Sequence, residues 1–265
     1  MKLVLVFALG AVLGCGASPT SSLDDAYHAM YNLQFEQAHQ AAHQWEQAHP
    51  TSPLGPASDA AADLFAEFDR LHILQSEFFA EDSNFLSLHR PAPDAQRKQE
   101  FDQALDQTRK LVASAPASDP DALFAQVLVF GLNSDYLALI EKRNFAALSE
   151  TKQARFAAEK LLAQRPDYYD AYLAVGVENY LLSLKPAPVR WFLRMGGSET
   201  DKEEGLQKLR LTAEHGHYLL PFARLLLAVA ALRDKDRDGA RRELGWLATQ
   251  FPGNHLFREE LAKVK

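Results

Sequence analysis

The chain has 265 residues, of which 47% are hydrophobic and 24% charged, so its composition is globular and excludes an intrinsically disordered chain. The formal net charge of −7 argues against a broad nucleic-acid-binding surface. The densest basic group, Arg237, Arg241 and Arg242, is interleaved with acidic residues and is interpreted as a solvated helix face. Cys15 is the single cysteine, so neither an internal disulfide nor a cysteine-based metal site can form.

The N-terminus has the features of an export signal. Lys2 precedes an apolar run of 11 residues, 3–13, which is too short to span a bilayer and has the length of a signal-peptide core. The run ends in Val12-Leu13-Gly14-Cys15. This resembles the bacterial lipobox, in which the cysteine becomes the lipid-bearing first residue, although Leu13 is larger than usual. The alternative is an ordinary secretory signal cleaved after Ala17.

We therefore expect a lipoprotein signal peptide at residues 1–14, lipidation of Cys15 and a flexible tether at 15–22. The residue after the cysteine is Gly16 and not Asp. By resemblance to sorted lipoproteins, the expected location in a diderm host is the periplasmic side of the outer membrane.

One pattern recurs four times in the rest of the chain: an alanine, a large apolar residue seven positions later and a proline five positions after that. The alanine and the large residue share one helix face, and the proline ends the helix. The four instances are Ala38/Trp45/Pro50, Ala104/Leu111/Pro116, Ala154/Leu161/Pro166 and Ala240/Leu247/Pro252.

This spacing resembles the second helix of a tetratricopeptide repeat (TPR). After Pro166, Tyr172, Val175 and Gly176 match the first helix of such a repeat, in which the glycine allows the two helices of a pair to touch. Successive prolines are 66, 50 and 86 residues apart. A regular repeat has about 34 residues. The resemblance therefore implies an all-α, irregular TPR-like α-solenoid of antiparallel helix pairs over 23–265. The alternative is a helical bundle whose helices happen to end in proline.

Helix-capping signals agree with this interpretation and predict about ten to twelve helices. Ser22 to Asp25 and Ser198 to Asp201 have the spacing of a capping box, and Asp119-Pro120 is a typical helix start. Leu123, Val127, Phe130 and Leu137 form a helical apolar stripe.

The segment 185–198 interrupts the repeats and divides the domain into possible sub-blocks, 23–184 and 199–265. It contains two prolines, the basic and aromatic residues Arg190, Trp191 and Arg194, and a closing Gly196-Gly197. Arg190 and Arg194 share a helix face that suits a carboxylate or phosphate partner. The favoured alternative is that Trp191 plugs the joint between two repeat blocks.

A second group of candidates follows from the resemblance, because first helices line the concave surface of such solenoids. Tyr168, Tyr172, Glu178 and Asn179 would then face a groove, with Asn133 and Tyr136 as companions on an earlier helix. The alternative for Tyr172 is a packing role.

The sequence contains no catalytic motif that we recognise, no phosphate-binding glycine loop and no evident metal site. His39 and His43 have a spacing that could bind metal, but no third ligand is evident, so we interpret them as part of a polar helix face. No cofactor is expected, and the chain is predicted not to be an enzyme.

The expected function is a membrane-anchored helical-repeat scaffold that binds a protein or peptide partner in the cell envelope. The alternative is an accessory subunit of an envelope transport or outer-membrane assembly system, with a small-ligand pocket. No nucleic-acid partner is expected, and the sequence does not predict an oligomeric state.

Overall fold

The computed structural model describes residues 22–73, 91–183 and 201–264. Within these ranges the protein has eleven α-helices and no β-strand, which confirms the predicted all-α class. The helices are α1 (Leu23–Tyr31), α2 (Phe35–Ala48), α3 (Leu54–Arg70), α6 (Ala95–Ser114), α7 (Pro120–Asp135), α8 (Asn144–Gln164), α9 (Tyr172–Ser183), α11 (Lys202–His215), α12 (Leu220–Arg233), α13 (Arg237–Gln250) and α14 (His255–Lys263). A π-helical turn, Tyr136–Ile140, extends α7, and a short 3-10 turn, Tyr169–Ala171, precedes α9.

Side-chain caps start most of these helices. The predicted capping box between Ser22 and Asp25 is present, and the Asp119 carboxylate accepts hydrogen bonds from the Asp121 and Ala122 backbone N–H groups at the start of α7. Such caps satisfy N–H groups that have no partner within the helix. Ser198 lies outside the described residues, and α11 begins with Asp201 as its N-cap.

The four recurring alanine–apolar–proline patterns coincide with α2, α6, α8 and α13. Each proline lies two residues beyond the end of its helix, as predicted. The four alanines are buried, and so are Leu161 and Leu247, whereas Trp45 and Leu111 are half-buried. The pattern therefore identifies helices whose small residue permits close packing and whose proline forces a turn.

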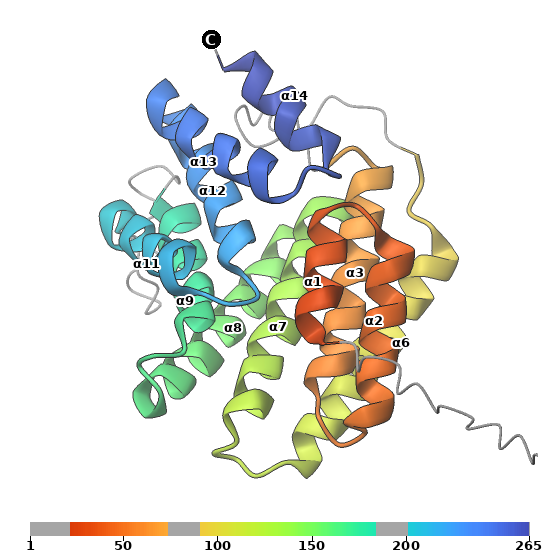
Figure 1. Ribbon diagram of the computed structural model, residues 1–265. Helices are drawn as coiled ribbons and strands as arrows, with labels where there is room; N and C mark the ends of the chain where they lie inside the picture. Colours follow the sequence, from red (N-terminus) through yellow and green to blue (C-terminus); the bar gives the residue numbers. More distant parts are fainter. Residues whose placement is uncertain (1–21, 74–90, 184–200, 265) are drawn as a thin grey trace, which may run out of the picture.

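Each helix packs against the next one along the chain, and α3 also contacts α1 and α7 (Figure 1). A very close approach joins α9 and α11. A Cβ atom on Gly176 would lie 2.9 Å from the carbonyl oxygen of Gly205, so these two helices can touch only because glycine stands there. This confirms the helix contact predicted at Gly176.

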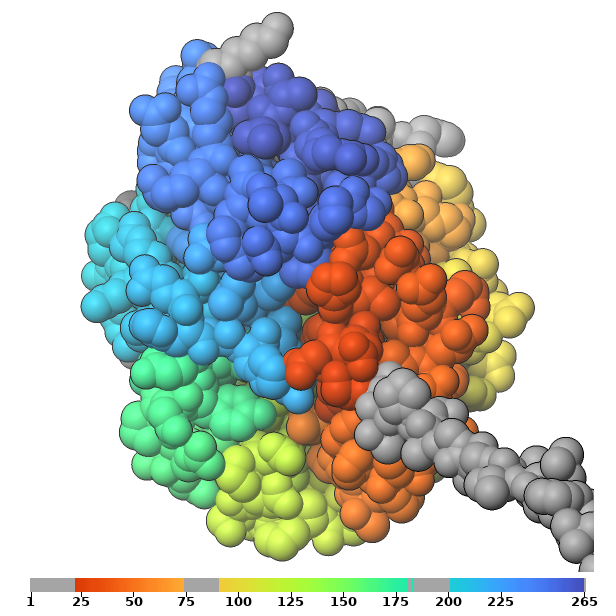
Figure 2. Space-filling view, in the orientation of Figure 1, coloured from red at the N-terminus to blue at the C-terminus, as the bar shows by residue number. Residues whose placement is uncertain are grey.

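The C-terminal helices return to the N-terminal helix, so the two ends of the helical array are in contact (Figure 1). The Tyr31 hydroxyl donates to the Tyr218 carbonyl oxygen (3.1 Å). The Asn32 side-chain oxygen accepts the Gly253 N–H (2.9 Å), and the Asn254 side-chain amide donates to the Tyr31 carbonyl oxygen (3.0 Å). In Figure 2 the surface of the C-terminal helices lies directly against that of α1.

Aromatic side chains fill the space that this closure encloses. We call the set the aromatic core; it comprises Tyr27, Tyr31, Phe65, Phe124, Tyr168, Tyr218 and Phe222. Tyr27 stacks on Tyr218 with ring centroids 4.8 Å apart, and Phe124 lies 5.0 Å from Tyr168. Because these residues come from α1, α3, α7, α12 and the turns before α9 and α12, the inner helix faces form one continuous interior.

A buried carboxylate holds the loop before α12 in place. Asp170 is 3% exposed and accepts hydrogen bonds from three consecutive backbone N–H groups, those of His217, Tyr218 and Leu219, at 2.8 to 3.3 Å. Burial raises the pKa of Asp170, while the backbone hydrogen bonds act in the opposite direction. This contact positions Tyr218 in the aromatic core.

Residues 120–140 are long and apolar enough to cross a membrane, with a mean hydropathy of 1.6. Half of this segment is buried inside the protein, however, and Leu123, Val127 and Leu137 of the predicted stripe lie in the interior, with Phe130 half-buried. A core helix has the same composition, so this helix carries no argument for a membrane span.

Candidate functional site

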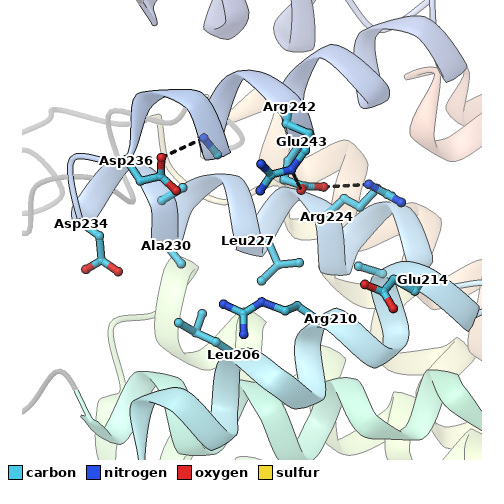
Figure 3. A pocket seen from close by; sticks show the side chains of 13 residues that line it. Leu206, Arg210, Glu214, Arg224, Leu227, Ala230, Asp234, Asp236, Arg242 and Glu243 are labelled. Atoms are coloured by element: carbon cyan, nitrogen blue, oxygen red, sulfur yellow. Dashed lines mark hydrogen bonds and ion pairs between the residues drawn. The ribbon is translucent and has the colours of Figure 1, made fainter.

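A cavity of about 360 Å³ lies between α11, α12 and α13, close to the lower limit of the volumes typical of ligand sites (Figure 3). We call it the arginine groove. Its apolar wall consists of Leu206, Ala213, Leu227, Ala230 and Ala231, and its charged lining of Arg210, Arg224, Arg242, Glu214, Asp234, Asp236 and Glu243. Each of the three helices contributes one arginine.

Arg224 is the most firmly held of the three arginines. Its guanidinium group donates to Glu243 (2.8 Å) and lies over the ring of Trp246, 4.3 Å from the centroid. The side chain is 20% exposed. Ion pairing and the cation–π contact fix its orientation at the groove.

The groove is lined by three guanidinium groups and four carboxylates, and most of the carboxylates already have a partner. Glu243 is shared by Arg224 and Arg242, whose Nε donates to it at 3.1 Å. Asp234 pairs with Lys202 (2.5 Å), and Asp236 accepts the Gly239 N–H as the N-cap of α13. Among the described residues, Glu243 is therefore the groove carboxylate that pairs with arginines of the lining.

Arg210 is the third arginine of the groove, and it is not one of the two that pair with Glu243. It is exposed and extends from α11 into the groove, below Leu227 (Figure 3). In the part of the chain that the structure describes, no carboxylate lies within ion-pair distance of Arg210. The groove thus combines an apolar wall with a cationic side chain that is free to bind an anionic group.

A second charged cluster lies between α2, α3 and α6, with two buried carboxylates and four half-buried residues around them. We call it the interior seam; it comprises His39, Asp59, Asp63, Glu67, Arg70 and Arg97. The His39 ring lies 2.6 Å from Asp59 and 3.6 Å from Asp63. Glu67 accepts two hydrogen bonds from Arg70 and one from the Asp94 backbone N–H (3.0 Å).

The seam shows which partners the polar face of α2 has at His39, namely Asp59 and Asp63 of α3. Burial alone would lower the pKa of His39, but the Asp59 hydrogen bond and the charges of Asp59 and Asp63 raise it above its usual value. Burial raises the pKa of Asp63 to about 7, although the charge of His39 opposes this. His39 therefore links α2 to α3, because the two carboxylates on α3 favour its charged form.

Three of the predicted partner-binding residues are inaccessible. Glu178 and Asn179 are 0% exposed and Tyr136 is 3% exposed. Glu178 pairs with Arg155 of α8 (2.9 Å), and Tyr136 stacks on Phe101 at 5.2 Å. The expectation that these side chains face a groove is wrong, because they are buried.

The other predicted residues have different positions. Tyr168 is half-buried and belongs to the aromatic core, Asn133 is half-buried, and Tyr172 is half-buried with its hydroxyl donating to the Pro166 carbonyl oxygen (3.2 Å). None of these three residues lines the cavity described above. Cys15, Arg190, Trp191 and Arg194 lie outside the described residues.

The residues of the arginine groove were not predicted as a site from the sequence. Arg242 was interpreted as part of a solvated face, and it is indeed 70% exposed, but it also contacts Glu243 at the groove. Arg224 did leave a signal: it is the single charged residue of α12 before Arg233. A lone arginine in an apolar helix requires a partner, and here Glu243 supplies it.

Within the described residues, no group of three or more histidine, cysteine, aspartate or glutamate side chains is arranged to hold a metal ion. No protein-family model matches the sequence, and no similar sequence was found among the curated proteins. The all-α fold and the arginine groove are therefore the basis for a functional proposal.

Proposed function

We propose that this chain is a membrane-anchored, TPR-like helical scaffold of the cell envelope that binds a partner protein or peptide and carries out no chemistry itself. The arginine groove is the proposed binding site. The stacking of each helix on the next and the four helix-ending registers support the repeat architecture. The single observation that carries the binding site is Arg210, which extends into a cavity of about 360 Å³.

The lining of the groove defines the chemistry of the partner. A leucine and alanine wall accommodates an apolar side chain, and Arg210 pairs with an acidic group beside it. Arginine does not titrate near neutral pH, and the described groove residues include no nucleophile held by a base, which suits binding rather than catalysis.

The anchor is the second part of the proposal. Lipidation of Cys15 would hold the folded domain on the membrane through a short tether, on the periplasmic side of the outer membrane in a diderm host. Cys15→Ser should move the protein from the membrane fraction to the soluble fraction. Unchanged membrane association of this variant would rule out the lipid anchor.

The binding site can be tested by site-specific photo-crosslinking in intact cells. A crosslinking amino acid replacing Leu227, in the groove wall, should capture a defined protein, and Arg210→Glu in the same chain should abolish that capture. A crosslinker at the exposed Lys110 of α6 is the matched control and should not capture this protein. Capture that is insensitive to Arg210→Glu would contradict the proposed site.

The alternative function is that of a transport or assembly accessory with a small-ligand pocket. The cavity volume favours it, because about 360 Å³ lies within the range of small-molecule sites. Native mass spectrometry of protein purified from its own envelope separates the two functions. A bound small molecule that is lost on Arg210→Glu, with no protein captured at Leu227, would favour the accessory function.

A further inference from the structure

Helix α2 has no large apolar side chain that is fully buried. Its three buried residues are alanines, Ala38, Ala41 and Ala42, and its aromatic residues Phe35 and Trp45 are half-buried. Helix α1, by contrast, buries two tyrosines, a leucine and a methionine. Because the hydrophobic contribution of a side chain grows with the apolar area that it removes from water, apolar packing stabilises α2 less than α1.

The start of α2 has little support from its own residues. Gln34, its N-cap residue, forms no side-chain hydrogen bond to the first turn. Leu33, just before it, has a φ of 60°, a left-handed conformation that is costly for a bulky residue. Proteins open locally where few apolar contacts oppose the opening. Helix α2 has these features of a segment that opens locally.

Two histidines of α2 contact carboxylates of α3. The Nδ1 atom of His39 lies 2.6 Å from one oxygen of Asp59, and the Nε2 atom of His43, one turn later, lies 3.2 Å from the other oxygen. The second ring nitrogen of His39 lies 3.6 Å from Asp63. Since His43 is exposed and His39 is half-buried, the contacts of His39 contribute more to holding α2 on α3.

The charges of the interior seam are balanced only while His39 is protonated. Three carboxylates lie four residues apart along one face of α3, and we call them the acidic row: Asp59, Asp63 and Glu67. The cations of the seam beside them are Arg70, Arg97 and His39. Loss of the proton from His39 leaves three carboxylates facing two guanidinium groups.

Asp63 is the carboxylate that this loss leaves without sufficient compensation. It is buried, and its neighbouring cations, His39 at 3.6 Å and Arg97 at 3.9 Å, are farther away than hydrogen-bonded partners. The Nε atom of Arg97 is buried and has no hydrogen-bond partner among the described residues. Glu67, by contrast, accepts two hydrogen bonds from Arg70. A buried carboxylate that loses its cation strongly destabilises the packing around it.

The flanking acids add to the negative charge of the row. Glu100 of α6 acts on Asp63 and Glu46 of α2 interacts unfavourably with Asp59, while the exposed His43 acts in the opposite direction on Glu46. Helix α1 meets α2 through alanines. The charged groups that face His39 and Asp63 are Glu46 and His43 of α2, Asp59 and Glu67 of α3, and Arg97 and Glu100 of α6.

The pKa shifts of His39 and Asp63 have the same sign. Burial by itself would lower the pKa of His39, but Asp59 and Asp63 raise it above its usual value, and burial raises the pKa of Asp63 to about 7. A group whose pKa is higher in the folded state stabilises that state fully below its unfolded pKa, and this contribution is lost as the pH rises through the folded pKa. The attachment of α2 to α3 therefore weakens as the pH rises past about 7.

We propose that α2 is a pH-operated flap over the acidic row. The flap is closed while His39 and Asp63 hold a proton between them, and it opens when that proton leaves. The row then carries a negative charge that the seam does not compensate, and water compensates it once α2 has moved away. Opening separates α2 from α3 and exposes Asp59 and Asp63 to solvent.

The neighbouring helices have separate support and stay in place. Helix α1 is joined to the C-terminal part of the chain by the hydrogen bonds of Tyr31 with Tyr218 and with Asn254. Helix α3 packs against α6 and α7 as well as against α2. Residues 32–34 and 49–53 connect the flap to α1 and α3 and are the segments in which the backbone turns.

Hydrogen–deuterium exchange of the purified protein tests the flap. Protection factors of α2 and α1, corrected for the intrinsic exchange rate at each pH, are compared at pH 6.5 and pH 8.5. The protection of α2 should fall by about tenfold or more, because one linked proton changes the opening equilibrium by up to about tenfold per pH unit. The protection of α1 should change by less than about threefold, since α1 contributes no residue to the seam.

Substitutions that change the charge balance test the cause. His39→Gln removes the titrating cation, so α2 should be weakly protected at both pH values. Asp63→Asn removes one carboxylate of the row, so α2 should stay protected at both. The double variant again has two carboxylates facing two guanidinium groups and should recover the protection of the parent at pH 6.5 to within about threefold. A packing role of His39 alone predicts no such rescue.

Asp106→Asn is the matched control, because it removes an exposed carboxylate of α6 and should retain the pH dependence of the parent. Three results would each overturn the proposal: equal loss of protection in α1 and α2, unchanged pH dependence in Asp63→Asn, or no rescue in the double variant. If the single variant His39→Gln does not fold, the Asp63→Asn result decides the proposal by itself.

Discussion

The interior seam and the arginine groove both bring charged side chains from three helices together. They differ in how completely those charges are paired within the protein. In the seam, Asp63 and Glu67 are each 2% exposed, and basic groups of the neighbouring helices or the same helix lie beside them. In the groove, one carboxylate serves two arginines and Arg210 extends into a cavity. Charges that are satisfied within the protein join helices, whereas charges left over beside a cavity are available to a ligand.

The largest expected effect concerns a buried carboxylate at the closure of the array. Asp170→Ala removes the acceptor of three backbone N–H groups, of which that of Leu219 is buried and those of His217 and Tyr218 are partly buried. We expect a loss of about 3–5 kcal/mol in the free energy of unfolding, measured by urea denaturation. Glu214→Ala, which removes an exposed carboxylate of the groove, is the control and should cost less than about 0.5 kcal/mol. Equal losses would break the distinction between interior and groove charges.

A smaller effect is expected where α11 packs against α9, on the side away from the groove. Gly176→Ala places a Cβ 2.9 Å from the Gly205 carbonyl oxygen and 3.0 Å from the Leu209 backbone nitrogen, so backbone atoms must shift. The expected loss is about 1–3 kcal/mol in the same denaturation experiment.

Gly131→Ala provides a control within another helix. A Cβ on Gly131 meets nothing within 4 Å, and alanine is the better helix former, so this change should stabilise the protein by about 0.5–1 kcal/mol. A stabilising Gly176→Ala would show that α9 and α11 are not in close contact.

The seam should also make stability depend on pH. The folded state raises the pKa of His39, so the protonated ring stabilises the protein fully below the unfolded pKa of about 6.5. That contribution is lost as the pH rises through the folded pKa. We expect the melting temperature to fall between about pH 6 and pH 8.5, and His39→Gln to reduce this fall by about 2–4 °C.

Substitution of Arg210 in the groove is expected to have the smallest effect on the free energy of unfolding. The same substitution is expected to have the largest effect on partner binding. Arg210→Gln should change the free energy of unfolding by no more than about 0.5 kcal/mol, because the side chain is exposed. It should nevertheless reduce partner capture from a crosslinker at Leu227. If Arg210→Gln strongly destabilised the protein and left partner capture normal, Arg210 would stabilise the fold as the seam residues do, and the contrast between the groove and the seam would be wrong.

Much of the local structure could be predicted, because its signals lie within a few residues of each other. Ser22 and Asp119 cap helices as their spacing indicates, and Pro50, Pro116, Pro166 and Pro252 each follow a helix end. The contact at Gly176 was also predicted from the repeat resemblance, because a glycine has no Cβ and so allows a neighbouring helix to approach closely. These features depend on backbone geometry and hydrogen bonding near each residue.

The partner-binding residues were predicted poorly, and this too has a physical reason. Tyr136, Glu178 and Asn179 have the side-chain chemistry of a binding surface, but packing turns them into the interior. Polarity by itself does not show whether a side chain faces solvent or a partner inside the protein. The resemblance assigned concave-face positions, and such a face requires an array that stays open.

The sequence by itself determined the helices, their ends and the small residues that let them pack, because caps, prolines and glycines act on their own stretch of chain. Only the tertiary structure decided that the array closes. The bonds that close it join residues 187 and 221 positions apart, namely Tyr31 with Tyr218 and Asn32 with Gly253. No local pattern encodes such contacts, because they require the helix packing angles to accumulate along the whole chain. That closure fills the interior with aromatic rings, while the arginine groove lies between α11, α12 and α13.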